Sequence, residues 1–504
     1  MDFLLSETTP TILWLSGVAG SGKSTLAVTA SDRCTKAGIQ SIHLFFERGK
    51  SKPSAIIRTI AYMIADRYPL VAPRIIEAAN KNKNINDSTL RDQFKQLLLD
   101  PLRAAANSII GPIVIILDAL DESGGVGERL HFLSLLKSDF ADLPSRVRIL
   151  LTSRPEDDIE CLSTQSHVRH IVLDHASYDC RRDVSTYIRS RMEVFKNVVK
   201  DWDEKVQVLC DAADGLFIWA STAVKMVHGS VHDAVHGSVN RRKRKFQMLV
   251  DDVRSVGGGI DSLYETALKE SEIWEDESEL KDSGTMILGL ILVSKEAIPE
   301  GTIAGILGLD EDVVDDVLRQ IRSVVSFNSE KTVRLHHSSF TDYLLSERSD
   351  YMPWHIDETW FRRSLTERCF DIMKDELQFN ICGIETSFVP NTEISGLKER
   401  IEKRISSQLN YACRFWSAHL CDLEWSDTRI KMRRELRIFA TSILLCWLEV
   451  LSLTGSFIRV AARALYDASS WISVSTSSYH VEGFIHFRSR LTQKYRPSCG
   501  PRIS

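Results

Sequence analysis

A glycine-rich segment near the start of the sequence carries the residues whose spacing points most directly to chemistry. The pattern G-x-x-x-x-G-K-[ST], typical of a loop that binds nucleotide phosphates, is matched by Gly17, Gly22, Lys23 and Ser24. Glycines let main-chain N–H groups point at an anion, and the helix that follows offers its positive N-terminal end. Lys23 adds a positive charge toward the terminal phosphates, and the Ser24 hydroxyl is a suitable Mg²⁺ ligand.

Two further residues complete the predicted nucleotide site. Gly20 is another position with a permissive backbone, and Thr25 supplies a second hydroxyl. The alternative is a glycine-rich turn that arose by chance. The flanking segments favour the phosphate loop, because the motif requires a strand before it and a helix after it. Ile12–Leu15 is apolar, and Leu26–Val28 is compatible with a helix.

A cluster of carboxylates follows a second apolar stretch, Ile113–Leu117, which predicts a strand buried on both faces of a parallel sheet. Carboxylates at the carboxyl end of such a strand lie where open α/β sheets bind ligands. We expect Asp118 to hold Mg²⁺ directly or through water. Glu122 or Asp121 is expected to orient a water molecule toward the γ-phosphate, which leaves the catalytic role open between them. The alternative role for such a carboxylate is to cap a helix.

Arg154 ends a third predicted buried strand, within residues 146–155, and should lie at the same sheet edge as Asp118. A guanidinium there is suited to contact a γ-phosphate and so to distinguish a triphosphate from a diphosphate. The alternative is a surface arginine before the turn at Pro155. Three strand ends that meet at one edge favour the phosphate contact.

The elements that position these residues predict an α/β fold followed by an all-α part. At 504 residues the chain is long enough for about three domains of ~150 residues. We expect a parallel sheet flanked by helices, as in a P-loop NTPase, and then a helical domain, a winged helix and a further helical region. The expected boundaries are 1–195 for the NTPase core, 196–275 for the helical domain, 276–350 for the winged helix, 351–468 for the helical region and 469–504 for a poorly ordered tail.

The winged helix is predicted from two short helices followed by two short strands. The helices are expected at Glu300–Leu307 and Glu311–Ile321, and the strands at Val324–Phe327 and Val333–Leu335. Winged helices often bind DNA, but the second helix is acidic, which disfavours contact with phosphates. We therefore expect no specific nucleic-acid partner.

Composition indicates an ordinary soluble protein. The net charge is −5 and the pI about 6.3, so the overall charge does not demand a nucleic-acid partner. The ten cysteines include no C-x-x-C pair, which is typical of reduced thiols in a cytoplasmic protein. The most apolar run, Ile438–Val450, is shorter than the ~20 residues that a membrane span needs. We interpret it as a buried core helix and expect no membrane partner.

The combination of motifs resembles the fungal NACHT-type signal-transduction NTPases, which are related to NOD-like receptors and whose core is often described as a nephrocystin-3-like N-terminal domain. The resemblance covers about residues 10–465, and its motifs are Gly17–Thr25, Asp118–Glu122, Arg154, Gly215–Ala220, His337–Leu344 and Trp447–Leu451. It implies that Gly17–Thr25 is the Walker A loop, Asp118–Glu122 the Walker B segment and Arg154 the sensor arginine. It further implies that His337, at the end of the winged helix, contacts the β-phosphate.

Relatives of this kind usually carry an N-terminal effector domain and C-terminal repeats. This sequence has only about a dozen residues before the first predicted strand and no 33- or 40-residue period. We expect that this chain alone does not signal.

Three functions are compatible with the sequence. The first is a switch that binds ATP or GTP with Mg²⁺ between the α/β core and the winged helix, hydrolyses it slowly or not at all, and controls assembly in an innate-immunity or cell-death-like pathway. Its partners would be the nucleotide and further copies of itself or other signalling proteins. The second is a small-molecule P-loop kinase, and the third is a nucleotide-binding scaffold without signalling activity. The winged-helix pattern favours the switch, since a kinase would need a lid and an acceptor pocket.

Overall fold

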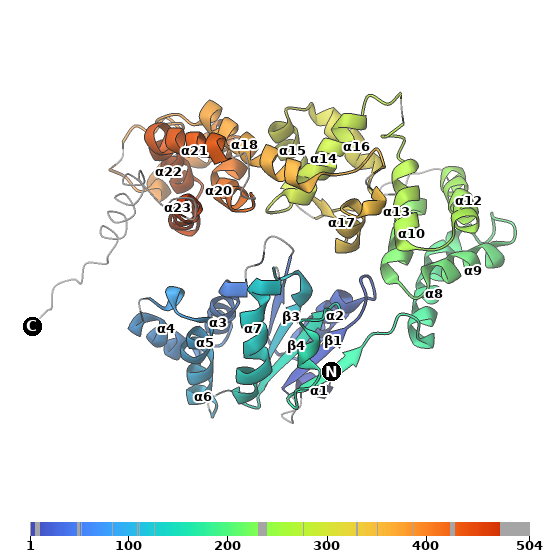
Figure 1. Cartoon of the computed structure of the whole chain (residues 1–504), viewed down its shortest axis with the longest axis horizontal. Helices are drawn as coiled ribbons and strands as arrows, with labels where there is room; N and C mark the ends of the chain where they lie inside the picture. The colour runs from blue at the N-terminus through green and yellow to red at the C-terminus, as the bar shows by residue number, and fades with distance from the viewer. Residues whose placement is uncertain are drawn as a thin grey trace, which may run out of the picture. The chain divides into compact units, whose positions relative to one another are not determined.

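The chain divides into two compact units, residues 1–266 and residues 267–504. Figure 1 shows the computed structural model, which describes residues 2–5, 11–47, 51, 53–82, 84–107, 109, 111–124, 126–229, 239–275, 277–328, 331–349, 351–386, 388–423 and 429–473. The predicted division into five domains stays a prediction.

A five-stranded parallel sheet forms the centre of the first unit, as the sequence predicted. Its strands lie in the order β2-β3-β4-β1-β5. Their bounds are β1 Ile12–Ser16, β2 Ser41–Phe45, β3 Ile113–Asp118, β4 Val147–Ser153 and β5 Val168–Val172. The central strands β3 and β4 are buried along their whole length, which explains their unbroken apolar sequences. One strand, β4, separates the strand that precedes the glycine-rich loop from the strand that ends in Asp118.

Helices cover both faces of the sheet, so the α/β prediction is confirmed. On one face Ala27 and Cys34 of α2 pack against Val114, Ile116 and Leu150. The other face packs against a larger apolar cluster that includes α3, α6 and α7. The helices of this part are α1 Asp2–Leu5, α2 Lys23–Lys36, α3 Ile56–Arg67, α4 Ala72–Lys81, α5 Leu90–Phe94, α6 Asp100–Ala105 and α7 Val126–Ser138.

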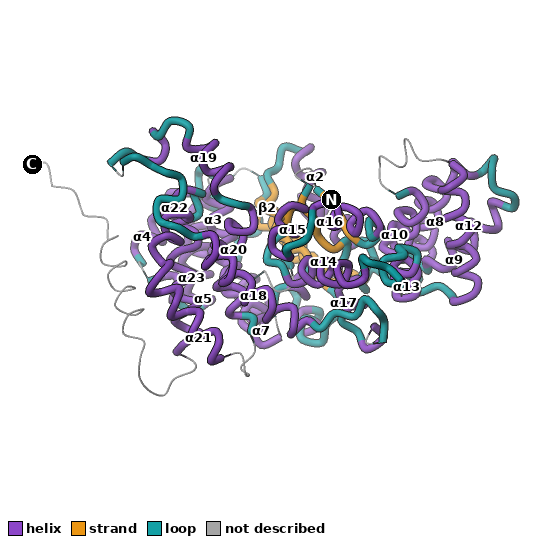
Figure 2. Tube along the Cα trace, turned by 90° about the horizontal axis from the view of Figure 1, so that it is seen from above, coloured by secondary structure: helices purple, strands orange, loops and turns teal. Residues whose placement is uncertain are grey.

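Helices follow the sheet to the end of the first unit and pack against one another (Figure 2). They are α8 Tyr178–Met192, α9 Trp202–Ala213, α10 Phe217–His228, α12 Val239–Val256 and α13 Ile260–Lys269, the last of which runs into the second unit. The start of α10 matters for the site described below, because it touches the glycine-rich loop.

The second unit begins with the elements expected of a winged helix. They are α14 Lys281–Val293, α15 Glu300–Leu307, α16 Glu311–Gln320, β7 Val325–Phe327, β8 Thr332–Leu335 and α17 Ser338–Leu344. A two-residue strand, β6 Ile298–Pro299, pairs with β8, so that β6, β8 and β7 form a three-stranded antiparallel sheet. The sequence did not predict β6, because two residues are too few to show an alternating pattern.

The rest of the second unit is helical, around an aromatic core that contains Trp416, Phe439 and Trp447. Its helices are α18 Glu358–Glu376, α19 Leu397–Arg404, α20 Ser407–Cys421, α21 Arg429–Ile438, α22 Leu444–Leu453 and α23 Phe457–Ser473. The predicted tail therefore starts inside α23, and its part after residue 473 lies outside the described residues.

The apolar run that we expected to be too short for a membrane belongs to a longer helix. A helical run of 24 residues, Ile430–Leu453, is long and apolar enough to cross a membrane by length and composition, so the argument from length was wrong. The most apolar window of this run is only 28% buried. Its inner side nevertheless belongs to the core, where the Trp447 indole N–H donates to the carbonyl oxygen of Cys413 at 2.8 Å.

Candidate nucleotide-phosphate site

The glycine-rich loop joins β1 to α2 and leaves no room for a side chain at Gly17 or Gly20. A Cβ at Gly17 would lie 2.8 Å from the Ser21 hydroxyl and 3.0 Å from the Leu173 carbonyl oxygen. Gly20 and Gly22 have φ values of 78° and 95°, in the left-handed region that favours glycine. The predicted glycines thus stand where the backbone needs them.

The start of α10 packs directly on this loop. The Ile218 N–H donates to the Gly20 carbonyl oxygen at 3.3 Å, and a Cβ at Gly20 would lie 1.9 Å from Cγ2 of Ile218. A Cβ at Gly22 would lie 3.5 Å from the Phe217 ring. The sequence indicated that Gly215–Ala220 is helical and resembles a segment that follows the core, but it assigned this segment no contact, because nothing local to it indicates what it touches.

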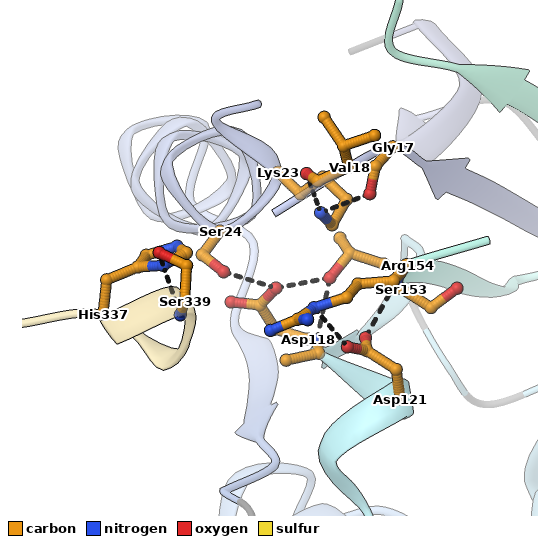
Figure 3. Close-up of polar contacts among 12 residues, drawn as sticks. Gly17, Val18, Lys23, Ser24, Asp118, Asp121, Ser153, Arg154, His337 and Ser339 are labelled. Atoms are coloured by element: carbon orange, nitrogen blue, oxygen red, sulfur yellow. Dashed lines mark hydrogen bonds and ion pairs between the residues drawn. The ribbon is translucent and has the colours of Figure 1, made fainter. Parts of the chain in front are cut away.

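Lys23 begins α2 and turns its ammonium group back into the loop (Figure 3). Its Nζ donates to the carbonyl oxygens of Gly17 at 2.7 Å and of Val18 at 2.9 Å. Burial lowers the pKa of Lys23 to about 8, and the nearby carboxylates of Asp121 and Asp118 act in the opposite direction. A largely buried cation at the mouth of a main-chain cradle is suited to meet an anion.

Ser24 and Asp118, the two residues predicted to hold Mg²⁺, lie next to each other, and their binding of the ion stays a prediction. The Ser24 hydroxyl donates to Oδ1 of Asp118 at 3.1 Å, although the two residues are far apart in the sequence. The Thr152 hydroxyl also donates to Oδ1, and its own oxygen accepts the Ala119 N–H at 2.9 Å. Ala119 has a φ of 61°, so Thr152 helps to hold a strained backbone just after the carboxylate.

Asp121 and Arg154 form a hydrogen bond and an ion pair with each other. The Arg154 main-chain N–H donates to Oδ1 of Asp121, and the guanidinium pairs with Oδ2 (Figure 3). Glu122 lies in the same turn, within electrostatic range of Lys23. The side chain of Thr25, in the first turn of α2, is exposed.

A buried arginine that sequence reasoning missed holds the acidic turn in place. Arg129 of α7 forms a two-pronged ion pair with Asp158, with Nε–Oδ2 and Nη2–Oδ1 distances of 2.9 and 3.0 Å. Its Nη1 donates to the carbonyl oxygens of Asp121 and Gly124. The sequence gives no signal for this contact, since an arginine within a helix is usually solvated.

The residues of this site fit a magnesium nucleotide. The Ser24 hydroxyl and Oδ1 of Asp118 lie 3.1 Å apart and offer two oxygen ligands, and the loop turns at Gly20 and Gly22 through left-handed backbone that favours glycine. Hydroxyl and carboxylate oxygens are the ligands that Mg²⁺ prefers, usually few in number and completed by water and phosphate. Within the described ranges no three His, Cys, Asp or Glu side chains gather in a way that would hold a metal ion by themselves.

His337 is the one predicted site residue that belongs to the second unit. Its Nδ1 accepts the Ser339 N–H at 3.1 Å and lies 2.8 Å from the Ser339 hydroxyl, so the ring caps α17 (Figure 3). The neighbouring His336 follows β8, and its main-chain N–H donates to the Val324 carbonyl oxygen. The contact of His337 with a phosphate stays a prediction.

Comparison with known families supports the assignment of the first unit. The family model described as Nephrocystin 3, N-terminal, matches residues 2–154. The match includes the glycine-rich loop and Asp118–Glu122, and it ends at Arg154. No curated protein matches the chain. Over this segment the chain is similar to a NACHT-like nucleotide-binding domain.

Proposed function

We propose that residues 1–266 bind a magnesium nucleoside triphosphate, ATP or GTP, and that the chain is a nucleotide-controlled switch of the NACHT signal-transduction type. The observation that carries the proposal is the Ser24–Asp118 hydrogen bond at the mouth of a loop in which a Cβ at Gly17 or Gly20 would meet neighbouring atoms too closely. Lys23 would hold the terminal phosphates, while Ser24 and Asp118 would hold Mg²⁺, which neutralises phosphate charge when bound. The match over residues 2–154 supports the same class.

The switch role rests on the winged-helix elements of the second unit. In this proposal Arg154 reports the γ-phosphate and His337 the β-phosphate, so that the state of the nucleotide controls association with other copies or with signalling proteins. The pathway would be of the innate-immunity or cell-death type, in the cytoplasm. Any hydrolysis would be slow, since a switch needs a long-lived triphosphate state. A scaffold without signalling activity and a small-molecule kinase remain the alternatives.

The test is calorimetric titration of ATP, ADP and GTP, each with and without Mg²⁺, into the full chain and its Lys23→Ala variant. Loss of one charge-assisted contact costs ~1.5–3 kcal/mol, which is roughly ten- to a hundredfold in affinity. Wild-type binding that Mg²⁺ strengthens, together with this loss in Lys23→Ala, supports the site. Equal affinity in both proteins would refute the phosphate-loop assignment, and rapid phosphate transfer to a small acceptor would favour the kinase.

A further inference from the structure

The carboxylate of Asp118 is held by hydrogen bonds on only one of its two oxygens. Oδ1 accepts from the hydroxyls of Ser24 and Thr152. Oδ2 is buried without a hydrogen-bond partner, and Nε2 of His43 lies 3.7 Å away from it. This Nε2 is itself buried without a hydrogen-bond partner. Two complementary polar atoms, each unsatisfied, thus face one another beside the predicted metal ligand.

The position of His43 is set by strand pairing and not by a loop. In the register of β2 and β3, Phe45 lies opposite Asp118 and His43 lies opposite Ile116. Because side chains alternate along a strand, His43 and Asp118 stand on the same face of the sheet as diagonal neighbours. The His43 side chain is 23% exposed whereas that of Asp118 is 1% exposed, so the ring covers the carboxylate from the edge of the sheet.

We propose that His43 is a positioning residue of the magnesium site, a role that rests on the proposed nucleotide function. A neutral imidazole with its proton on Nε2 is a hydrogen-bond donor, and Oδ2 of Asp118 is an acceptor that lacks one. A donor on this side stops the carboxylate from rotating, so that Oδ1 remains with Ser24, where Mg²⁺ is needed. Partners of ligating carboxylates commonly tune metal affinity in this way.

Two other roles for His43 are less well supported. Direct ligation of Mg²⁺ by His43 is disfavoured because Mg²⁺ prefers oxygen ligands, whereas imidazole suits softer metal ions such as zinc and copper. A purely space-filling ring would not need a nitrogen opposite an unsatisfied carboxylate oxygen. The positioning role therefore predicts that a donor at this place matters more than the shape of the side chain.

The experiment compares His43→Leu and His43→Gln in the full chain. Leucine removes the donor, whereas the glutamine amide nitrogen reaches about as far as Nε2. Nucleotide affinity is measured by calorimetry in EDTA. Metal affinity is measured on the nucleotide-saturated protein by electron paramagnetic resonance of Mn²⁺, with Mg²⁺ as the competitor. We expect His43→Leu to lower metal affinity roughly ten- to a hundredfold without changing nucleotide affinity in EDTA. His43→Gln should restore most of the loss.

Ser41→Ala is the matched control. Ser41 lies two residues earlier on the same face of β2, and its hydroxyl is paired with that of Ser31, away from Asp118. This variant should leave metal affinity unchanged. The proposal is overturned by unchanged metal affinity in His43→Leu, by a failure of His43→Gln to restore it, or by an equal loss of nucleotide affinity in EDTA. A wild-type chain that binds no nucleotide would refute the proposed function itself, which separates the two failures.

Discussion

The guanidinium of Arg154 and the carboxylate of Asp121 form an ion pair with 3.3 Å between Nε and Oδ2. The Arg154 main-chain N–H donates to the other carboxylate oxygen at 2.9 Å. Both oxygens of Asp121 are thus engaged by one residue at the end of β4. Asp121 is only 6% exposed and Arg154 25% exposed, so water screens the pair less than it would a surface pair. The residue proposed to sense the γ-phosphate is held in place by a residue proposed to act on water.

This pairing predicts a graded loss of triphosphate binding. Arg154→Ala should lower the affinity for a non-hydrolysable triphosphate roughly tenfold or more. It should leave the affinity for the diphosphate within about twofold of the wild-type value, because only the γ-phosphate contact is removed. Asp121→Asn should have a smaller effect in the same direction, since it releases the guanidinium without removing it. Calorimetry on both variants and on the double variant checks this. If the losses of the two single variants simply add in the double variant, Asp121 does not act through Arg154.

The same pairing separates the two candidate catalytic carboxylates. Because Arg154 engages both oxygens of Asp121, a substitution of Asp121 would also disturb the arginine, so the role of orienting the attacking water is tested at Glu122. Glu122→Gln should slow hydrolysis by on the order of a hundredfold with unchanged nucleotide affinity. Single-turnover phosphate release measures the rate, with calorimetry as the control for binding. Wild-type hydrolysis in Glu122→Gln would remove Glu122 from this role.

The contact between α10 and the phosphate loop predicts that Gly20→Ala is unusually harmful. Gly20 and Gly38 have nearly equal φ values, 78° and 75°, so alanine incurs a similar backbone cost of ~1–2 kcal/mol at either position. At Gly38 a Cβ would meet nothing within 4 Å, whereas at Gly20 it would overlap Ile218. We expect Gly20→Ala to lose more unfolding free energy than Gly38→Ala in urea titrations, and to lose nucleotide binding as well. Equal destabilisation by the two variants would mean that the start of α10 moves aside at little cost in free energy.

The sequence was sufficient to predict features that depend on local patterns. The run Ile113–Leu117 is apolar at every position because β3 is buried on both faces, and the spacing of Gly17, Gly22 and Lys23 reflects a local turn. Features set by packing between distant segments were not predictable. No periodic pattern in the sequence indicates these features. They are the position of β4 between β1 and β3, the contact of Ile218 with Gly20, and the hydrogen bond from Arg129 to the acidic turn.

The helix at 430–453 illustrates a different limit of sequence reasoning. The apolar stretch Ile438–Val450 was recognised, but its extension toward Ile430 passes through several charged residues. Met432 and Leu436 in that extension are buried, with exposed fractions of 0% and 2%, because one side of the helix continues along the core. Composition along the chain averages the two sides of such a helix, whereas packing depends on one side only.

A buried lysine predicts how stability varies with pH. Burial lowers the pKa of Lys225 from 10.5 to about 8, so between these values the unfolded chain binds more protons than the folded chain. The contribution of Lys225 to the free energy of unfolding should therefore rise with pH across this window, and Lys23 acts in the same direction. Buried thiols such as those of Cys369 and Cys413, whose pKa values burial raises, act in the opposite direction at the upper end of the window, so the slope is compared between variants. Lys225→Met should reduce the slope in urea titrations made at several pH values, whereas substitution of the exposed Lys200 by Met should not. An unchanged slope in Lys225→Met would contradict the lowered pKa.

The last prediction separates two roles of His337. Its Nδ1 caps α17, so His337→Leu would remove the cap, at a cost of about 0.5–2 kcal/mol, together with any phosphate contact. Asparagine is a favourable N-cap but has no imidazole, so His337→Asn should keep the stability of α17. If the ring donates to the β-phosphate, His337→Asn should lower the affinity for ADP more than the affinity for ATP. It should also increase the oligomeric fraction measured by light scattering. His336→Asn is the control and should change neither. If His337→Asn binds both nucleotides like the wild type, the histidine serves only to cap α17.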